Sequence, residues 1–106
     1  MKSLRNVHPG EVLYEEFLVP MNLSQNAIAR AIGVAPRRIN EIVLGKRAVT
    51  ADTALRLAKA FGTTPEFWMS LQASYDLEEA SRSLEAVVGG IEPVWRRGRG
   101  SEVAVA

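Results

Sequence analysis

The segment PRRINEIVLGKR, residues 36–47, carries four cations and several side chains that can form paired hydrogen bonds. Arginine can donate two parallel hydrogen bonds to the edge of a guanine, and glutamate can accept one from a cytosine. Lysine and arginine also neutralise phosphate groups. A buried helical hairpin would not need cations at both ends of one short helix. The segment therefore predicts a surface for an anionic partner outside the protein.

The distribution of charge supports this interpretation. From Ser24 to Thr50 the chain has five basic residues and one acidic residue, a net charge of +4, although the whole chain carries only +1. From Ala51 to the end, six basic residues stand against eight acidic ones. The positive charge is concentrated in one stretch, as expected for a phosphate-facing surface.

Two predicted helices position these side chains. Ser24 is a suitable N-cap for the first helix, and Gly33 is placed to end it. Pro36 fits the first position of the second helix, which Gly45 ends. Because the connection between them is short, the pattern predicts a helix-turn-helix over about 24–44.

The spacing of small and apolar residues agrees with that motif. A helix that reads DNA lies in the major groove and is held there by a second helix packed across it. Ala29 is small enough for close packing, Gly33 tolerates a positive φ in the turn, and Ile39 is an apolar anchor. The other residues expected to point inward are also apolar: Ile28, Ile32, Val34 and Ile42.

The opposite face of the second helix carries four polar side chains: Arg37, Arg38, Asn40 and Glu41. These residue types can contact base edges. Arg37 and Glu41 are one helical turn apart, so they either read neighbouring bases or pair with each other in the free protein. Two arginines at a helix N-terminus oppose the helix dipole, which favours a functional role over ordinary solvated charges.

Three further residues are candidates for phosphate contacts. Gln25 opens the first helix, where its side chain and the backbone N–H groups can meet a phosphate, although a plain helical role is also open. Lys46 and Arg47 directly follow the second helix and are placed for the same DNA strand further along. Cations are also favourable near a helix C-terminus, so a structural role for this pair stays open.

The remaining sequence predicts helices and no strands, which makes the fold all-α: a compact domain of five helices over residues 1–85. Pro9 begins the first helix, and Thr50 and Thr64 cap the fourth and fifth. Residues 86–106 contain adjacent glycines and the run WRRGRG, without periodicity. This composition predicts a flexible basic C-terminal tail.

Composition argues against several classes of protein. The 106 residues suit one domain, and the absence of cysteine excludes disulfides and thiolate metal sites. The single histidine, His8, is expected to bond at the start of the first helix, and the pairs Glu15-Glu16 and Glu78-Glu79 resemble solvated helix faces. We therefore expect no enzyme, metal or cofactor. Without an apolar run long enough to span a membrane or a signal peptide, a cytoplasmic location is expected.

The sequence resembles the Cro/C1-type helix-turn-helix family, and more closely the HigA-type antitoxins of bacterial toxin–antitoxin pairs. The resemblance covers about residues 7–77, through HPGEVLYEEFL, LSQNAIARAIGVAPRRINEIVLGKRAVTADTALRLAKAFGTTPEFWMSLQ and YDL. The HPGE opening and the long tract through PEFW are more specific than a bare helix-turn-helix. The resemblance implies a homodimeric repressor that binds its own operator and a small ribonuclease toxin of the HigB type.

The resemblance also implies roles for individual residues. Carried over by position, the family's base contacts fall on Arg37, Arg38 and Glu41. Its phosphate contacts fall on four residues: Gln25, Asn40, Lys46 and Arg47. Pro36 departs from the polar residue that often begins this helix in the wider family. That position has no side chain to hydrogen-bond a base, so more weight falls on Arg37.

A symmetric dimer would place two such helices about 34 Å apart, in successive major grooves of a palindromic operator. Its expected interface is Trp68, Leu71 and Tyr75, with the aromatic rings also contributing to the core, because nothing after them is predicted to cover them. The alternative is a protein-interaction module that sequesters a partner, with weak or no specific DNA binding. A palindrome upstream of the gene would favour the repressor, whereas a neighbouring toxin gene is consistent with either.

Overall fold

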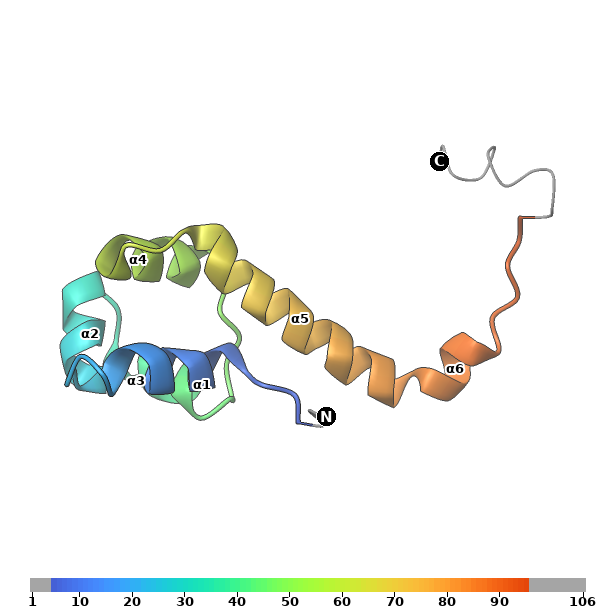
Figure 1. Ribbon diagram of the computed structural model, residues 1–106, viewed down its shortest axis with the longest axis horizontal. Coiled ribbons are helices and arrows are strands. Elements are labelled where there is room, and N and C mark those ends of the chain that lie inside the picture. Colours follow the sequence, from blue (N-terminus) through green and yellow to red (C-terminus); the bar gives the residue numbers. More distant parts are fainter. Residues whose placement is uncertain (1–4, 96–106) are drawn as a thin grey trace.

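The computed structural model describes residues 5–95, and every regular element in this range is a helix (Figure 1). The elements are α1 (Pro9–Val12), η1 (Leu13–Leu18), α2 (Gln25–Ile32), α3 (Pro36–Val43), α4 (Ala51–Phe61), α5 (Pro65–Ser83) and α6 (Glu85–Gly89). The predicted all-α fold with its helix-turn-helix is confirmed. None of these helices combines the length and the apolar character that crossing a membrane requires.

The predicted first helix runs from α1 directly into η1, but η1 is a π-helix. Leu13 and Leu18 are five positions apart, and both are buried. In a π-helix the hydrogen bonds run from residue i to i+5, as the bond from the Val19 N–H to the Tyr14 carbonyl does at 2.9 Å. The wider turn brings both leucines onto the core.

Side chains cap the helices as the sequence predicted. Ser24, Thr50 and Thr64 each accept a hydrogen bond from the backbone N–H three residues further on. Gly33 ends α2 with a φ of 76°, and Gly62 ends α4 with a φ of 73°. These left-handed conformations suit glycine and turn the chain at the helix ends.

One core joins η1 to the four helices that follow it. Ala29 of α2 is fully buried and α2 packs against α3, as expected for a close crossing. The buried apolar residues of the core are Leu13, Leu18, Ile28, Ala29, Ile32, Ile39, Ile42, Val49, Ala54, Leu57, Ala58 and Trp68. Burial of these side chains fixes the inward face of each helix, and therefore its outward face too.

Trp68 is fully buried within a single chain, so the prediction that its side chain forms a dimer surface is wrong. Its ring lies 5.2 Å from that of Phe17, 6.4 Å from Phe61 and 5.1 Å from Phe67. Its indole N–H donates a hydrogen bond of 2.8 Å to the hydroxyl of Thr63. The first helix and α4 therefore cover the ring. Only the core role of this tryptophan stands.

α5 extends well beyond the core (Figure 1). Its last buried residue is Gln72, Tyr75 is half-buried, and every later residue up to 95 is exposed. A break at Leu84 separates α5 from α6, which ends at Gly89. Helical structure therefore reaches four residues into the segment predicted as a flexible tail. The tail arginines lie among residues 96–106, outside the described residues.

Candidate nucleic-acid interface

The second helix of the motif, α3, has one face fixed by the core. Ile39 and Ile42 are fully buried, and the α2–α3 turn positions the start of α3. The Arg37 side chain is 82% exposed, which makes it the most accessible of the three predicted base contacts. A long cationic side chain on the outward face of this helix can reach a base edge in a groove.

Glu41 connects two of the predicted DNA-contacting arginines. Its Oε2 accepts a hydrogen bond from Arg37 Nε at 2.8 Å, and its Oε1 accepts one from Arg47 Nε at 2.9 Å. The pairing of Arg37 with Glu41 in the free protein, one of the two alternatives from the sequence, is thus observed. The two guanidinium groups, Arg37 first, hold the pKa of Glu41 below its usual value. Glu41 therefore stays ionised and restrains both arginines.

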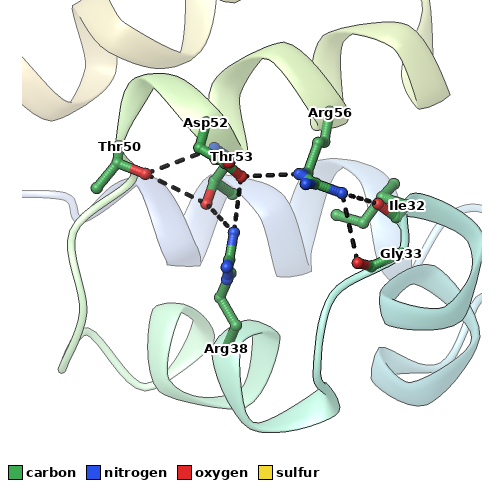
Figure 2. Close-up of polar contacts among 7 residues, drawn as sticks. All are labelled: Ile32, Gly33, Arg38, Thr50, Asp52, Thr53 and Arg56. Atoms are coloured by element: carbon green, nitrogen blue, oxygen red, sulfur yellow. Dashed lines mark hydrogen bonds and ion pairs between the residues drawn. The ribbon is translucent and has the colours of Figure 1, made fainter.

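Arg38 points to a different part of the molecule (Figure 2). Its Nη1 lies 2.8 Å from Asp52 Oδ1 and 3.3 Å from the hydroxyl of Thr53, both at the start of α4. The Arg38 side chain is only 30% exposed. The structure therefore brings Arg37, Glu41 and Arg47 together but not Arg38, which packs against α4.

Asp52 also binds Arg56, four residues further along α4, at 2.7 Å (Figure 2). Arg56 in turn donates from Nη1 to the carbonyl oxygens of Ile32 at 2.7 Å and Gly33 at 3.4 Å. Hydrogen bonds from Arg56 and then Arg38 hold the pKa of Asp52 below its usual value. One carboxylate thus connects α3, α4 and the end of α2.

The predicted phosphate contacts Gln25 and Asn40 lie next to each other. Asn40 Nδ2 donates a hydrogen bond to Gln25 Oε1 at 3.3 Å, across the α2–α3 pair. This bond uses the oxygen of Gln25 and leaves its NH₂ group, a double donor, available for a phosphate oxygen. Gln25 is the first residue of α2, where the helix dipole also favours an anion.

The end of α3 fixes the position of Lys46 and Arg47. Gly45 has a φ of 77°, and the N–H of Lys46 donates to the carbonyl of Glu41 at 2.8 Å. This arrangement is a Schellman-type helix end. It directs both exposed cations away from the core, beside the outward face of α3.

Three residues that hold α3 and its neighbouring segments in place were not predicted from the sequence. Gly10, in α1, is buried against the backbone of Ile42 in α3, where a β-carbon would overlap the Ile42 carbonyl. Gln72 accepts a hydrogen bond from the Val49 N–H at 2.7 Å and so holds the segment between α3 and α4. Asp52 accepts hydrogen bonds from Arg38 and Arg56. Its spacing of four from Arg56 was the one available signal for a wider network.

The geometry agrees with the comparisons with known proteins. A profile of the helix-turn-helix family matches residues 15–68. Antitoxin HigA-1 of Vibrio cholerae is 35% identical over 91 residues, which cover 86% of each chain. The chain belongs to the HigA group of the helix-turn-helix family. This family consists of regulators and antitoxins and is not a class of enzymes.

Two further relatives are similar over most of their length. Virulence-associated protein I of Dichelobacter nodosus is 49% identical over 81 residues, 76% of this chain and 75% of that protein. The solved structure of Pseudomonas aeruginosa antitoxin HigA with the higBA promoter is 41% identical, with a TM-score of 0.82. That match covers 85% of this chain and 99% of the Pseudomonas chain. The likeness therefore extends beyond the helix-turn-helix itself.

Proposed function

We propose that this HigA-family protein is a DNA-binding transcriptional repressor and the antitoxin of a toxin–antitoxin pair. It represses its own operon at a palindromic operator and neutralises a HigB-type ribonuclease. The observation that carries the proposal is the Arg37–Glu41–Arg47 cluster, presented on the outward face of a helix whose other face is locked in the core. The Pseudomonas relative was solved with its promoter, which supports a similar role here.

In this proposal Arg37 and Glu41 contact bases, while a group of four residues contacts phosphates: Gln25, Asn40, Lys46 and Arg47. Arg37 is the most exposed of the predicted base contacts and can donate both of its terminal N–H groups to a guanine. The phosphate contacts come from the first residue of α2, from one residue within α3 and from the two cations that follow α3. Such contacts fix the position of the protein on the duplex, and the base contacts choose the sequence.

Dimerisation is assigned to α5 and α6. Leu71 and Tyr75 are half-buried and continue into a run of exposed apolar side chains: Leu77, Leu84, Val87, Val88 and Ile91. Leu77 is 71% exposed, and several exposed apolar side chains gathered on one segment are typical of an interaction surface. A second copy of the chain would cover these residues and set the spacing between the two recognition helices. Leu77→Glu should therefore lower the mass measured by sedimentation equilibrium from dimer towards monomer.

The decisive experiment for the proposed function is a DNA titration of the purified protein. The DNA upstream of its own gene is compared with a scrambled fragment at two salt concentrations. A preference of about 10³ or more, with steep loss of affinity in salt, is expected for a specific repressor. Equal and weak binding to both fragments would favour a module that acts only by sequestering a partner protein.

The antitoxin role needs a separate test, because DNA binding and toxin binding are independent activities. Co-expression with the product of the adjacent gene should restore the growth that this product inhibits, and the two proteins should co-purify. A neighbouring product that binds the protein without being toxic would argue against the antitoxin assignment. We also propose a cytoplasmic location, since both proposed partners are found there.

A further inference from the structure

We propose that Asp52 determines operator specificity without touching DNA, by holding the recognition helix α3 in register through Arg38. The inference rests on the proposed DNA-binding function. It replaces the predicted base contact of Arg38 with a positioning role, because its guanidinium already engages the start of α4 (Figure 2). Asp52 is then the residue that decides where Arg38 lies.

The network centred on Asp52 connects three helices: α2, α3 and α4. One carboxylate oxygen, Oδ1, accepts from Arg38 of α3 at 2.8 Å and from Arg56 of α4 at 2.7 Å. Arg56 continues to the carbonyl of Ile32, the last residue of α2, at 2.7 Å. That carbonyl has no partner inside its own helix, so Arg56 both hydrogen-bonds the end of α2 and forms an ion pair with Asp52.

Polar contacts of this kind restrain the position of α3 in a directional way, which apolar packing in the core does not. Ile39 and Ile42 bury one face of α3 and so set which face points outward, but apolar burial is non-directional and does not by itself fix where the start of the helix lies. The hydrogen bonds that Arg38 donates to the Asp52 carboxylate and the Thr53 hydroxyl are directional and resist movement of the helix start. Base recognition needs side chains held within about 0.5 Å of their productive positions. The Arg38–Asp52 bond therefore affects how accurately Arg37 is presented.

Simple electrostatics makes the opposite prediction for a loss of Asp52. An acidic residue beside a DNA-binding surface repels phosphates, so removing its charge should strengthen binding to every DNA sequence alike. It would also free Arg38, a cation that could then contact a phosphate. If Asp52 positions α3, its loss instead weakens the operator complex while non-specific binding stays equal or rises.

The test is a titration of Asp52→Asn against operator and scrambled DNA, beside wild type. Glu66→Gln is the matched control, because Glu66 also occupies the first turn of a helix and is exposed, but forms no ion pair with any residue between 5 and 95. We expect the operator-to-scrambled affinity ratio to fall about tenfold in Asp52→Asn, within the range of single-site effects on specific DNA complexes. Glu66→Gln should keep the wild-type ratio.

A double-mutant cycle separates positioning from base reading by Arg38. Arg38→Met keeps the apolar stem and removes the guanidinium. If Arg38 acts through Asp52, adding Arg38→Met to Asp52→Asn should lower the operator-to-scrambled affinity ratio little further, because the two changes break the same interaction. An undiminished fall of that ratio in the double variant would assign Arg38 to a base and overturn the inference. Melting temperatures confirm that each variant is folded at the assay temperature.

The outcomes distinguish the inference from the proposed function. A wild-type chain without operator preference would overturn both. A wild-type preference that Asp52→Asn leaves intact, or an equal gain of affinity for both fragments, would overturn only the positioning role of Asp52. A lower operator-to-scrambled affinity ratio in Asp52→Asn, together with the wild-type ratio in Glu66→Gln, would support the positioning role.

Discussion

Gly10 of α1 lies so close to Ile42 of α3 that a β-carbon on the glycine would overlap the Ile42 carbonyl oxygen. The contact is between two backbones, so neither side can yield by changing a rotamer. It places the start of the first helix directly against the recognition helix. This close approach gives a physical reason for the glycine in the HPGE opening, since any other residue would push α1 away from α3.

Gly10→Ala is therefore expected to destabilise the protein by about 2–3 kcal/mol, the upper part of the range for overpacked sites. The measurement is the free energy of unfolding in a urea titration. Gly89→Ala is the matched control, because Gly89 is also helical and a β-carbon there would meet nothing within 4 Å. That change should be neutral or slightly stabilising. Equal stabilities for the two variants would mean that α1 moves away from α3 without cost.

Arg37→Ala should weaken operator binding by about 1–3 kcal/mol and relax discrimination at one base pair. The reason is that Arg37 is exposed on α3 and can form paired hydrogen bonds with a guanine. The measurement is a set of titrations against operators changed one base pair at a time. Arg30→Ala, which removes another exposed cation from α2, is the control for charge alone. If Arg37→Ala weakened random DNA equally, Arg37 would be a phosphate contact.

Lys46→Ala should weaken binding to all DNA sequences alike and reduce the slope of log affinity against log salt by about one. Lys46 is exposed just after the end of α3, where a phosphate contact needs only a point charge. Lys59→Ala, which removes an exposed lysine from α4, serves as the comparison and should leave the slope nearly unchanged. An unaltered slope for Lys46→Ala would show that Lys46 does not contact a DNA phosphate.

The features that depend on neighbours in sequence could be predicted. The caps at Ser24, Thr50 and Thr64 need only a side chain and a backbone N–H three residues away, and all three are confirmed. The positive φ of Gly33 could likewise be predicted, because glycine is the residue that tolerates this backbone conformation. The pairing of Arg37 with Glu41 was one of two predicted outcomes because residues four apart share a helix face.

The features that depend on packing between distant segments could not be predicted. Arg38 lies in α3 and Asp52 in α4, with the end of α3 and a loop between them, so their spacing in the sequence does not indicate that they pair. Trp68 was predicted to join a dimer interface as well as the core, because no later residue was expected to cover it, whereas Phe17, from the first helix, does. The π-helical turn at Leu13–Leu18 follows from the core that both leucines enter, not from helix propensity.

His8 gives the protein a pH-dependent stability. Its Nδ1 accepts a hydrogen bond from the Gly10 N–H at 2.9 Å, and its ring packs edge-on against Tyr75 with centroids 4.8 Å apart. The predicted structural role at the helix start is thus observed. Burial lowers the pKa of His8, and the nearby Asp76 carboxylate opposes that shift only in part. The imidazole therefore stays neutral in the folded protein at a pH where the unfolded chain already binds a proton.

The sign of the effect follows from this difference in proton binding. The unfolded histidine titrates near its ordinary pKa of about 6.5, and the folded one titrates lower. As the pH falls from about 7 through this interval, the unfolded state binds more protons, so the free energy of unfolding decreases. Because the chain has one histidine, proton NMR of its imidazole should show a single titration with a midpoint below 6.5.

His8→Asn is the matching variant, because asparagine keeps a side-chain acceptor for the Gly10 N–H but does not titrate. Its unfolding free energy should depend less on pH between 7 and about 5.5 than that of wild type. Carboxylates such as Glu41 and Asp52 titrate in both proteins, and their contribution cancels in the difference. A histidine midpoint above its ordinary value would show that the Asp76 carboxylate outweighs burial, and the contribution of His8 to the pH slope would then change sign.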